Sequence, residues 1–378
     1  MSATGSGGLI RGFQRRDGRI GLRNIILVVS LLDLANDVAS RVVGAVPRAV
    51  ALLSPTGGLS FGEEAALLAK LRRRLATNPN VGAVLAVAPL STPARDFLGG
   101  LESGVAQRAI VLAEHRDSAR AVAAGIAEAQ ELGRDLRRLR RSPCGLGSLR
   151  LGLRSSLSSR SSQHLVNPAV GKLVDRVVEA GGGVVFSELA DLAAVSDLLV
   201  ARAVTPAIAA AEAAFRATRR TLAALGSLAP DPTLMNQSGG IATLRAKGYG
   251  ALRRLGRSPL ASVLTYGEEA PARGLHMIDG PGSAAVSLVG LAAAGCTALV
   301  YTVGTSSIVA SMPLMPTLKL GPPELSGSRD LDLVVTPGDA RAWAALEAAL
   351  CQTASGRLGA GERDAPRSLM LPNFLSPL

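Results

Sequence analysis

The chain is short of cysteine and of aromatic residues. It holds three cysteines in 378 residues, and Cys144, Cys296 and Cys351 lie far apart with no CxxC pair. This spacing excludes a disulfide framework and favours a reducing, cytoplasmic setting. Aromatic residues make up only 3% of the chain, whereas 48% is hydrophobic. We therefore expect a folded protein whose core is built from leucine, valine and alanine.

Acidic residues are outnumbered, yet the positive charge forms no pattern typical of nucleic-acid binding. The chain has 41 Lys+Arg against 29 Asp+Glu, a net charge of +12. The densest cluster of arginines lies within residues 134–141, and no aromatic side chains alternate with them there. Proteins that bind single strands stack bases on such rings. We expect no nucleic-acid partner and interpret the cluster as a solvated helix end and linker, with a phosphate-binding patch as the alternative.

No segment is expected to cross a membrane. The first residues, MSATGSGG, lack the charged-then-apolar order of a signal peptide. Residues 283–317 are uncharged and long enough for a span, but glycines and prolines interrupt them. We predict a helix at 283–294 and a buried strand at 297–303 instead, because buried parallel strands are continuously apolar.

Alternating strand and helix patterns predict an α/β fold. Four apolar strands are expected in the first half, at 25–30, 50–53, 81–87 and 109–113. Six are expected in the second half, at 149–153, 184–187, 262–265, 274–278, 297–303 and 332–336. Helical patterns between them indicate parallel sheets that are covered on both faces. We predict two doubly wound, mainly parallel-sheet domains with the site in the crevice between them: a flexible tail at 1–11, a first domain at 12–140 and a C-terminal domain at 141–378.

The most specific motif is GFQRRDGRIGLRN at residues 12–24. Its three glycines allow tight turns and close backbone approach. Arg15, Arg19 and Arg23 recur every four residues, and the guanidinium fork suits carboxylates. The segment is interpreted either as part of an anion-binding site or as a basic N-terminal arm.

This string resembles the GYxRxDGRxGxRN opening of the altronate/galactarate dehydratase family, the sugar-acid hydro-lyases that also include the large subunit of sulfolactate sulfo-lyase. Shorter pieces match in order along nearly the whole chain: Asn36 with Val38-Ala39, Asn78-Pro79-Asn80, Asn167-Pro168-Ala169 with Gly171, Ser187-Glu188, Gly239-Gly240, Asp279-Gly280-Pro281-Gly282, Gly304, Pro313, Pro316 and Leu318-Lys319.

The resemblance implies that the chain removes water from a sugar acid, taking the proton α to the carboxylate before the β-hydroxyl leaves. Glu188 and Asp279, both at the ends of expected strands, become the candidates for acid–base chemistry, and Lys319 joins them as a catalytic candidate. The small-molecule carboxylate is expected to contact a further set of residues: Arg15, Arg19, Arg23, Asn24, Asn167, Gly239 and Gly240.

The chain departs from the family at the motifs that carry cysteine and histidine there. The corresponding positions are Leu34, Ser54, Gly58, Ser91 and Ser155. Thiolate and imidazole are good transition-metal ligands, whereas these side chains are not. The departures speak against the family's divalent metal, iron or manganese, and leave Mg²⁺ or Mn²⁺ on oxygen ligands as the remaining metal option. A non-catalytic member that binds a carboxylate ligand or a partner subunit is the alternative function.

The resemblance also bears on partners. Single-chain dehydratases of the family carry a small β-rich domain before the GYxRxDGR motif, whereas here the motif begins at Gly12 after a Gly/Ser-rich lead. This arrangement resembles that of the sulfolactate sulfo-lyase large subunit. We therefore expect a large subunit that either pairs with a separate small subunit or has dispensed with it, and self-association into a homo-oligomer.

Overall fold

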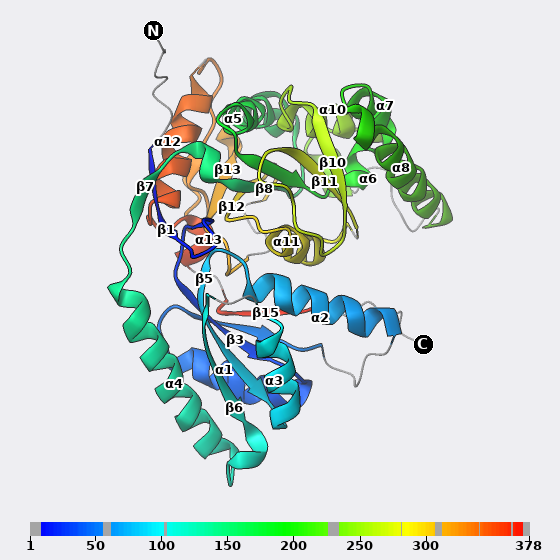
Figure 1. Cartoon of the computed structure of the whole chain (residues 1–378). Helices are drawn as coiled ribbons and strands as arrows, with labels where there is room; N and C mark the ends of the chain where they lie inside the picture. Colours follow the sequence, from blue (N-terminus) through cyan, green and yellow to red (C-terminus); the bar gives the residue numbers. More distant parts are fainter. Residues whose placement is uncertain are drawn as a thin grey trace. The chain divides into compact units, whose positions relative to one another are not determined.

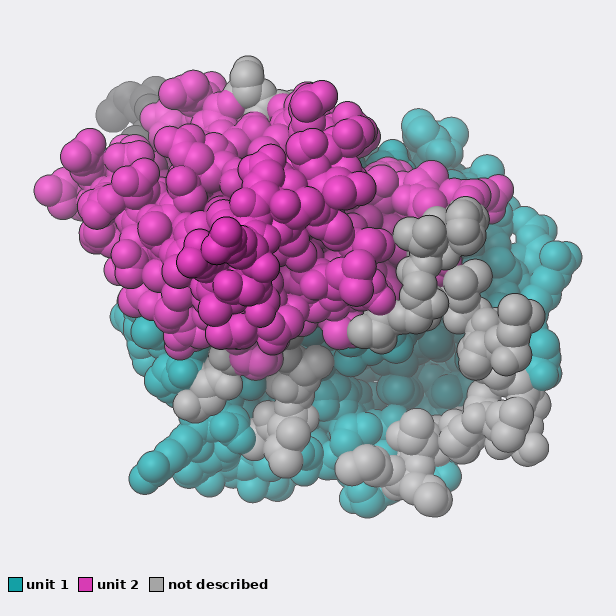
Figure 2. Space-filling view, turned by 90° about the horizontal axis from the view of Figure 1, so that it is seen from below, with its two compact units in different colours: residues 1–10, 143–311, 316–364 teal, residues 11–142, 312–315, 365–378 magenta. Residues whose placement is uncertain are grey.

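The chain forms two compact units (Figures 1 and 2). The computed structural model describes residues 9–55, 62–101, 104–225, 234–280, 282–306, 312–339, 341–363 and 366–372. Unit 2, magenta in Figure 2, holds residues 11–142 together with 312–315 and the C-terminal stretch that contains 366–372. Unit 1, teal, holds most of the rest. Two segments that the sequence assigned to the C-terminal domain therefore pack with the first domain.

Unit 2 is a parallel sheet between helices. Its elements are β3 (Ile25–Ser30), α1 (Asn36–Ala45), β4 (Ala49–Leu53), α2 (Gly62–Ala76), β5 (Val81–Ala88), α3 (Ser91–Gly99), β6 (Ala106–Val111), α4 (Ser118–Arg138) and β15 (Ser368–Met370). The strand order is β15-β4-β3-β5-β6, and every neighbouring pair is parallel. The last strand of the chain thus forms one edge of a sheet whose other strands come from the first 111 residues.

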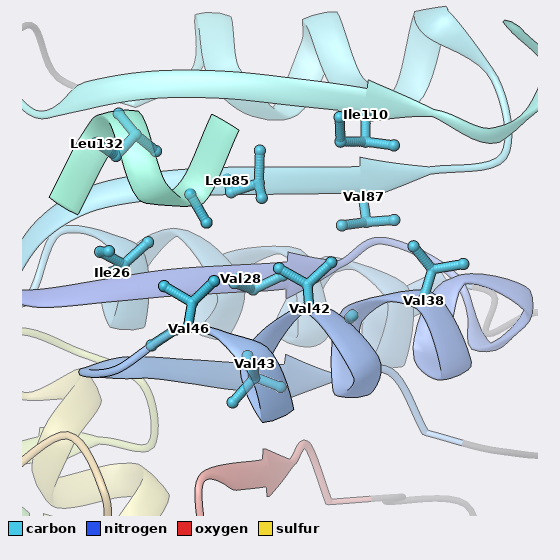
Figure 3. Close-up of a cluster of buried hydrophobic side chains, with 14 of the residues drawn as sticks. Ile26, Val28, Val38, Val42, Val43, Val46, Leu85, Val87, Ile110 and Leu132 are labelled. Atoms are coloured by element: carbon cyan, nitrogen blue, oxygen red, sulfur yellow. The ribbon is translucent and has the colours of Figure 1, made fainter. Parts of the chain in front are cut away.

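The core of unit 2 lies between this sheet and the helices α1 and α4. Figure 3 shows Val42 of α1 beside Val28 of β3, and Val38 of α1 on the side of Val87 of β5, all of them buried. Branched side chains fill the surface of a buried parallel strand well. This packing sets the strands in register and brings their carboxyl ends to one edge of the sheet.

The glycine-rich motif forms a small antiparallel hairpin. β1 (Ile10–Gln14) pairs with β2 (Ile20–Gly21), and β7 (Ser142–Cys144) adds a third strand. Gly18 takes a φ of +84° in the turn, a backbone conformation that other residues rarely adopt.

Unit 1 is built on a second parallel sheet. Its elements after β7 are β8 (Arg150–Ser155), α5 (Asn167–Glu179), β9 (Gly183–Phe186), α6 (Leu189–Leu192), α7 (Ser196–Val200), α8 (Thr205–Leu225), α9 (Leu234–Ser238), α10 (Leu244–Arg254), β10 (Leu260–Thr265), β11 (Gly274–Asp279), α11 (Ala284–Ala293), β12 (Ala298–Thr302), β13 (Thr317–Gly321), β14 (Leu333–Val334), α12 (Ala342–Ala354) and α13 (Ala360–Arg363). The order is β10-β11-β9-β8-β12-β13-β14, and all pairs are parallel. The predicted α/β class with parallel sheets is confirmed.

The strand order of unit 1 reverses at β8. The three strands that follow β8 in the chain, β9, β10 and β11, lie on one side of it, and the next three, β12, β13 and β14, lie on the other. In open α/β sheets, ligands bind beyond the carboxyl ends of the strands at such a reversal. For unit 1 that position is the edge where β8 ends at Ser155 and β12 ends at Thr302.

The uncharged stretch near residue 290 forms α11 and β12, as the sequence predicted. Within the described ranges, no helix is long and apolar enough to cross a membrane. β13 was not predicted, because prolines precede it and a lysine stands in its centre. It therefore places Lys319 on a buried strand rather than after a loop.

Candidate functional site

A buried carboxylate, Glu188, lies at the carboxyl edge of the unit 1 sheet. It follows β9 by two residues and is 4% exposed. Its Oε1 accepts hydrogen bonds from the backbone N of Ser155 at 2.9 Å and from the Ser155 hydroxyl at 2.6 Å. Arg154 Nη1 lies 3.4 Å from the same oxygen, and Arg254 Nη2 donates to Oε2. The end of β8, the end of β9 and helix α10 thus meet at one carboxylate.

These contacts keep Glu188 ionised. Burial favours the neutral acid, but Arg254, Arg154 and the two Ser155 donors outweigh it and hold the pKa of Glu188 below its ordinary value. A carboxylate with a lowered pKa is a poor proton donor at neutral pH. The geometry therefore favours Glu188 as the group that positions two guanidiniums.

The group of Arg154, Arg254 and Glu188 has a formal charge of +1, because two cations share one carboxylate. Several buried polar atoms of this group, or of residues that follow strands of the same sheet, have no hydrogen-bond partner within the described part of the chain. They include Arg154 Nε, Arg254 Nε, Ser187 Oγ and Thr305 Oγ1. Buried polar atoms are normally paired, so unpaired ones need an explanation. The excess positive charge of the group is one that an anionic ligand would balance.

A serine-rich loop, residues 155–163, lies over this edge and is fixed by close contacts. Ser158 N donates to Asn236 Oδ1 at 2.8 Å, and Arg160 N donates to the carbonyl of Gly239 at 2.8 Å. A Cβ on Gly239 would stand 2.6 Å from the Ser158 carbonyl oxygen, and one on Gly304 would clash with Ser159 N. Both glycines are therefore needed for backbone to approach backbone.

The other predicted residues of unit 1 take different places. Asp279 is exposed at the end of β11, and the turn after it reaches the cluster, because Gly282 O accepts from Arg154 Nη2 at 3.3 Å. Lys319 is 7% exposed and lies beside Tyr301 in the β12–β13 pairing. Gly240 follows Gly239 with a φ of +81° beside Arg160. Asn167 is buried and donates to Gly250 O at 2.9 Å.

In unit 2 the motif arginines bind backbone carbonyls. Arg15 donates to Pro79 O at 2.7 Å and to Arg23 O at 2.8 Å, and burial lowers its pKa to about 10 despite nearby Asp17. Arg19 donates to Asp17 at 2.7 Å and to Thr77 O at 3.1 Å.

The last two motif residues bond in the same way. Arg23 Nη1 donates to Leu22 O at 2.8 Å, and Asn24 Nδ2 donates to Leu136 O at 3.4 Å. Together these side chains fasten the motif to the rest of unit 2. Carboxylate binding by Arg15, Arg19, Arg23 and Asn24 stays a prediction.

The donor set does not fit the divalent metal that the sequence resemblance implies. Among the residues described here, no three His, Cys, Asp or Glu side chains lie close enough together to hold a metal ion. Both oxygens of Glu188 already face guanidiniums, which repel a cation. Ser54 likewise receives a hydrogen bond from Arg72. Gly58, one of the substituted positions, lies outside the described residues.

Sequence reasoning missed Arg154 and Arg254. A signal for Arg154 was present, since a charged residue stands one position before the end of an apolar strand. Arg254 stands next to Arg253 on α10, and only Arg254 is buried. Nothing in the sequence distinguishes the two.

Comparisons with known proteins match both units. A model of the D-galactarate/altronate dehydratase C-terminal region matches residues 146–326, and one of the D-galactarate dehydratase/altronate hydrolase second domain matches residues 12–137. The (2R)-sulfolactate sulfo-lyase subunit beta of Chromohalobacter salexigens is 26% identical over 317 residues, covering 82% of this chain and 80% of that protein.

Two dehydratases are similar over a smaller share of their length. The altronate dehydratase of Bacillus subtilis is 24% identical over 330 residues, which is 82% of this chain and 65% of that enzyme. The galactarate dehydratase (L-threo-forming) of Escherichia coli is 27% identical over 201 residues, which is 53% of this chain and 38% of that enzyme. The chain thus spans less than two thirds of each dehydratase.

Proposed function

Because the chain belongs to the D-galactarate/altronate dehydratase family, we propose that it is a hydro-lyase that removes water from a sugar acid such as altronate or galactarate. Lyase chemistry is what the dehydratases and the sulfo-lyase among its relatives have in common. The observation that carries the proposal is the buried, net positive group of Arg154, Arg254 and Glu188 at the strand-order reversal of unit 1.

In this proposal the guanidiniums stabilise negative charge. Removing the proton α to a carboxylate turns the acid into an enolate-like species with more charge on its oxygens. Arg154 and Arg254 supply N–H donors that are held in place by Glu188 before the reaction begins. Preorganised donors aimed at developing charge give the largest single contribution to many enzyme rates.

Asp279 is the proposed base. Its carboxylate is exposed at the end of β11, and the turn that follows contacts Arg154 through Gly282. Asp279 takes the α proton, the electron pair of that C–H bond forms the C=C bond, and the β C–O bond breaks. The departing hydroxyl takes up one proton from solvent and leaves as water. Strands β9, β8 and β12 separate β13 from β11, so Lys319 stays a predicted catalytic residue without an assigned step. Asn167, Gly239 and Gly240 are proposed to shape the substrate-binding surface.

The test is a substrate screen by proton NMR in deuterium oxide with altronate, galactarate and (2R)-sulfolactate. Water loss from altronate or galactarate is expected, together with a fall of about 10²-fold or more in Asp279→Asn, the usual loss for an acid–base group. Arg154→Met should lose activity too. Arg253→Met is the matched control, since Arg253 is exposed and its side chain bonds to His164 rather than to Glu188. Activity that disappears on chelation with EDTA would contradict the proposed role of the arginines.

A second function is favoured by the same cluster. Glu188 is paired twice and ionised, and metal-ligating side chains do not gather in the described part of the chain. A family member that binds a carboxylate without reacting it would keep such an arrangement. Tight binding of galactarate with no α-proton exchange and no water loss would support this alternative over the lyase.

We further propose that the chain assembles with a separate small subunit or with itself. The support is that the Chromohalobacter relative is a subunit beta. Size-exclusion chromatography with light scattering should give a mass well above the 38.6 kDa of one chain, either alone or after the small subunit is added. A single species at the chain mass in both experiments would contradict the proposal.

A further inference from the structure

Arg72 brings a positive charge to the carboxyl edge of the unit 2 sheet. It projects from α2 and donates from Nη2 to the Ser54 hydroxyl at 3.1 Å. Ser54 follows β4 directly and is 2% exposed. Its hydroxyl donates in turn to the carbonyl of Ser30, the last residue of β3, at 2.8 Å. The guanidinium therefore lies beside the ends of two neighbouring parallel strands.

Ser54 is held rigidly in this position. The side chain of Asn36, at the start of α1, forms two hydrogen bonds with the Ser54 backbone. Asn36 Oδ1 accepts from Ser54 N, and Asn36 Nδ2 donates to Ser54 O, both at 3.0 Å. The Ser54 hydroxyl that Arg72 contacts is therefore already ordered. Binding a ligand there costs little further conformational entropy.

The charge of Arg72 is not balanced. Across the described ranges, Arg72 forms no ion pair, and its Nε is shielded from solvent with no hydrogen-bond partner. Burial lowers the pKa of Arg72, with no carboxylate nearby to raise it again. Burying a cation is costly unless it is paired. Arg254 in unit 1 is buried against Glu188, whereas Arg72 is half-buried against a neutral hydroxyl.

We propose that Arg72 and Ser54 form a binding site for a small oxyanion, a carboxylate or a phosphate group. A guanidinium offers five N–H donors in a planar fork that fits two oxygens at once. One of these donors is used here, on Ser54. The place also fits, since ligands of parallel sheets bind at the carboxyl ends of the strands. The proposal concerns binding alone and stands whether or not the chain removes water from a sugar acid.

The experiment is calorimetric titration of the full chain with galactarate and, separately, with inorganic phosphate. The variants are Arg72→Met, which removes the charge but keeps an unbranched side chain, and Arg73→Met, the control from the next, exposed position of α2. Arg72→Met should lose one equivalent of bound anion or weaken binding about tenfold or more, as expected for a charge-assisted bidentate pair. Arg73→Met should bind as the wild type does.

The two anions separate the sources of the oxyanion. Binding of galactarate alone assigns a carboxylate ligand, and binding of phosphate alone assigns a phosphorylated one. Binding of both supports the shared chemistry. If Arg72→Met does not fold by circular dichroism, Arg72→Lys keeps the charge but loses the fork, and several-fold weaker binding is expected. The proposal is overturned if the wild type binds neither anion, or if the folded Arg72 variant binds with unchanged affinity and stoichiometry.

Discussion

Two opposing effects act on the charged form of Glu188. Loss of hydration destabilises it, whereas two guanidiniums and two hydrogen-bond donors of Ser155 stabilise it. Removing one partner of such a buried group leaves charge without compensation, and this costs more than the intact group contributes. The carboxylate of Glu188 is what allows Arg154 and Arg254 to be buried next to each other. Its structural role can therefore be measured without a substrate.

Glu188→Gln should lower the free energy of unfolding at neutral pH by about 3–5 kcal/mol, the usual loss when a buried ion pair is broken. The side chain keeps its shape, so the loss reports the charge. Urea denaturation followed by circular dichroism measures it. Asp279→Asn is the matched control, because Asp279 is exposed, and it should change stability by less than about 0.5 kcal/mol. Equal effects of the two substitutions would contradict the assignment.

The difference between wild type and Glu188→Gln should depend on pH. The pKa of Glu188 is lowered in the folded chain, so its stabilising contribution is fully present above the ordinary value of 4.5. The contribution is lost as the pH falls from there through the lower folded pKa, because in this range the unfolded state takes up the proton and the folded state does not. Denaturation series between pH 3 and pH 7 test this. A difference that stays constant to the acid end would show that folding does not lower the pKa of Glu188.

The sequence allowed us to predict that Glu188 lies at the end of a strand. It did not allow us to predict that Arg154 and Arg254 pair with it. A buried apolar strand followed by an acid is a local pattern, and it is visible in one short window. Arg254 reaches Glu188 from a helix 66 residues away, and the docking of that helix decides which arginine is buried. The motif arginines show the opposite case. In a segment with little regular structure the backbone carbonyls lack partners, and Arg15 uses its donors on them.

At the scale of elements, the start of α5 shows why a local signal was insufficient. Asn167-Pro168 has the sequence of a helix start, but the backbone already turns helically from Ser162, and Val166 takes the cap position. The Asn167 side chain bonds to Gly250 O of α10 instead. A contact between helices thus replaces the cap, and only the packed structure shows it.

Gly239→Ala should displace the serine-rich loop. The added methyl would lie 2.6 Å from a backbone oxygen of Ser158, so backbone must move. Such overpacking costs about 1–3 kcal/mol. Chemical denaturation measures it, and hydrogen exchange of residues 155–163 should quicken. Gly145→Ala is the control, since a Cβ there meets nothing within 4 Å. Unchanged exchange in Gly239→Ala would show that the loop does not depend on this contact.

At the scale of the whole molecule, the sheet of unit 2 includes an edge strand, β15, that lies more than 250 residues after its other strands in the sequence. Leu371 N donates to Leu53 O at 3.0 Å, and the side chain of Leu371 is 1% exposed. Arg367 also donates to the carbonyls of Val43 and Val46. The pattern was missed in the sequence because β15 is short and its amphipathic alternation spans only three residues.

Leu371→Ala should destabilise unit 2 by about 2–5 kcal/mol, the usual cost of truncating a buried leucine. Met370→Ala is the matched control, because Met370 is the next residue in the chain and its side chain is 47% exposed. Hydrogen exchange should quicken in β4 and leave the sheet of unit 1 unchanged. Faster exchange in both sheets would show that the two units unfold together.

The position of β15 also determines the order of events on the ribosome. The chain is made from its N-terminus, so β3, β4, β5 and β6 are synthesised first, whereas β15, the edge strand beside β4, follows every described strand of unit 1. Until then β4 presents an open edge, and open edges recruit other strands. Domains generally fold in the order of synthesis, but here the described strands of unit 1 are all made before the described sheet of unit 2 is complete. A nascent chain stalled before residue 368 should therefore carry a finished unit 1 and an incomplete unit 2.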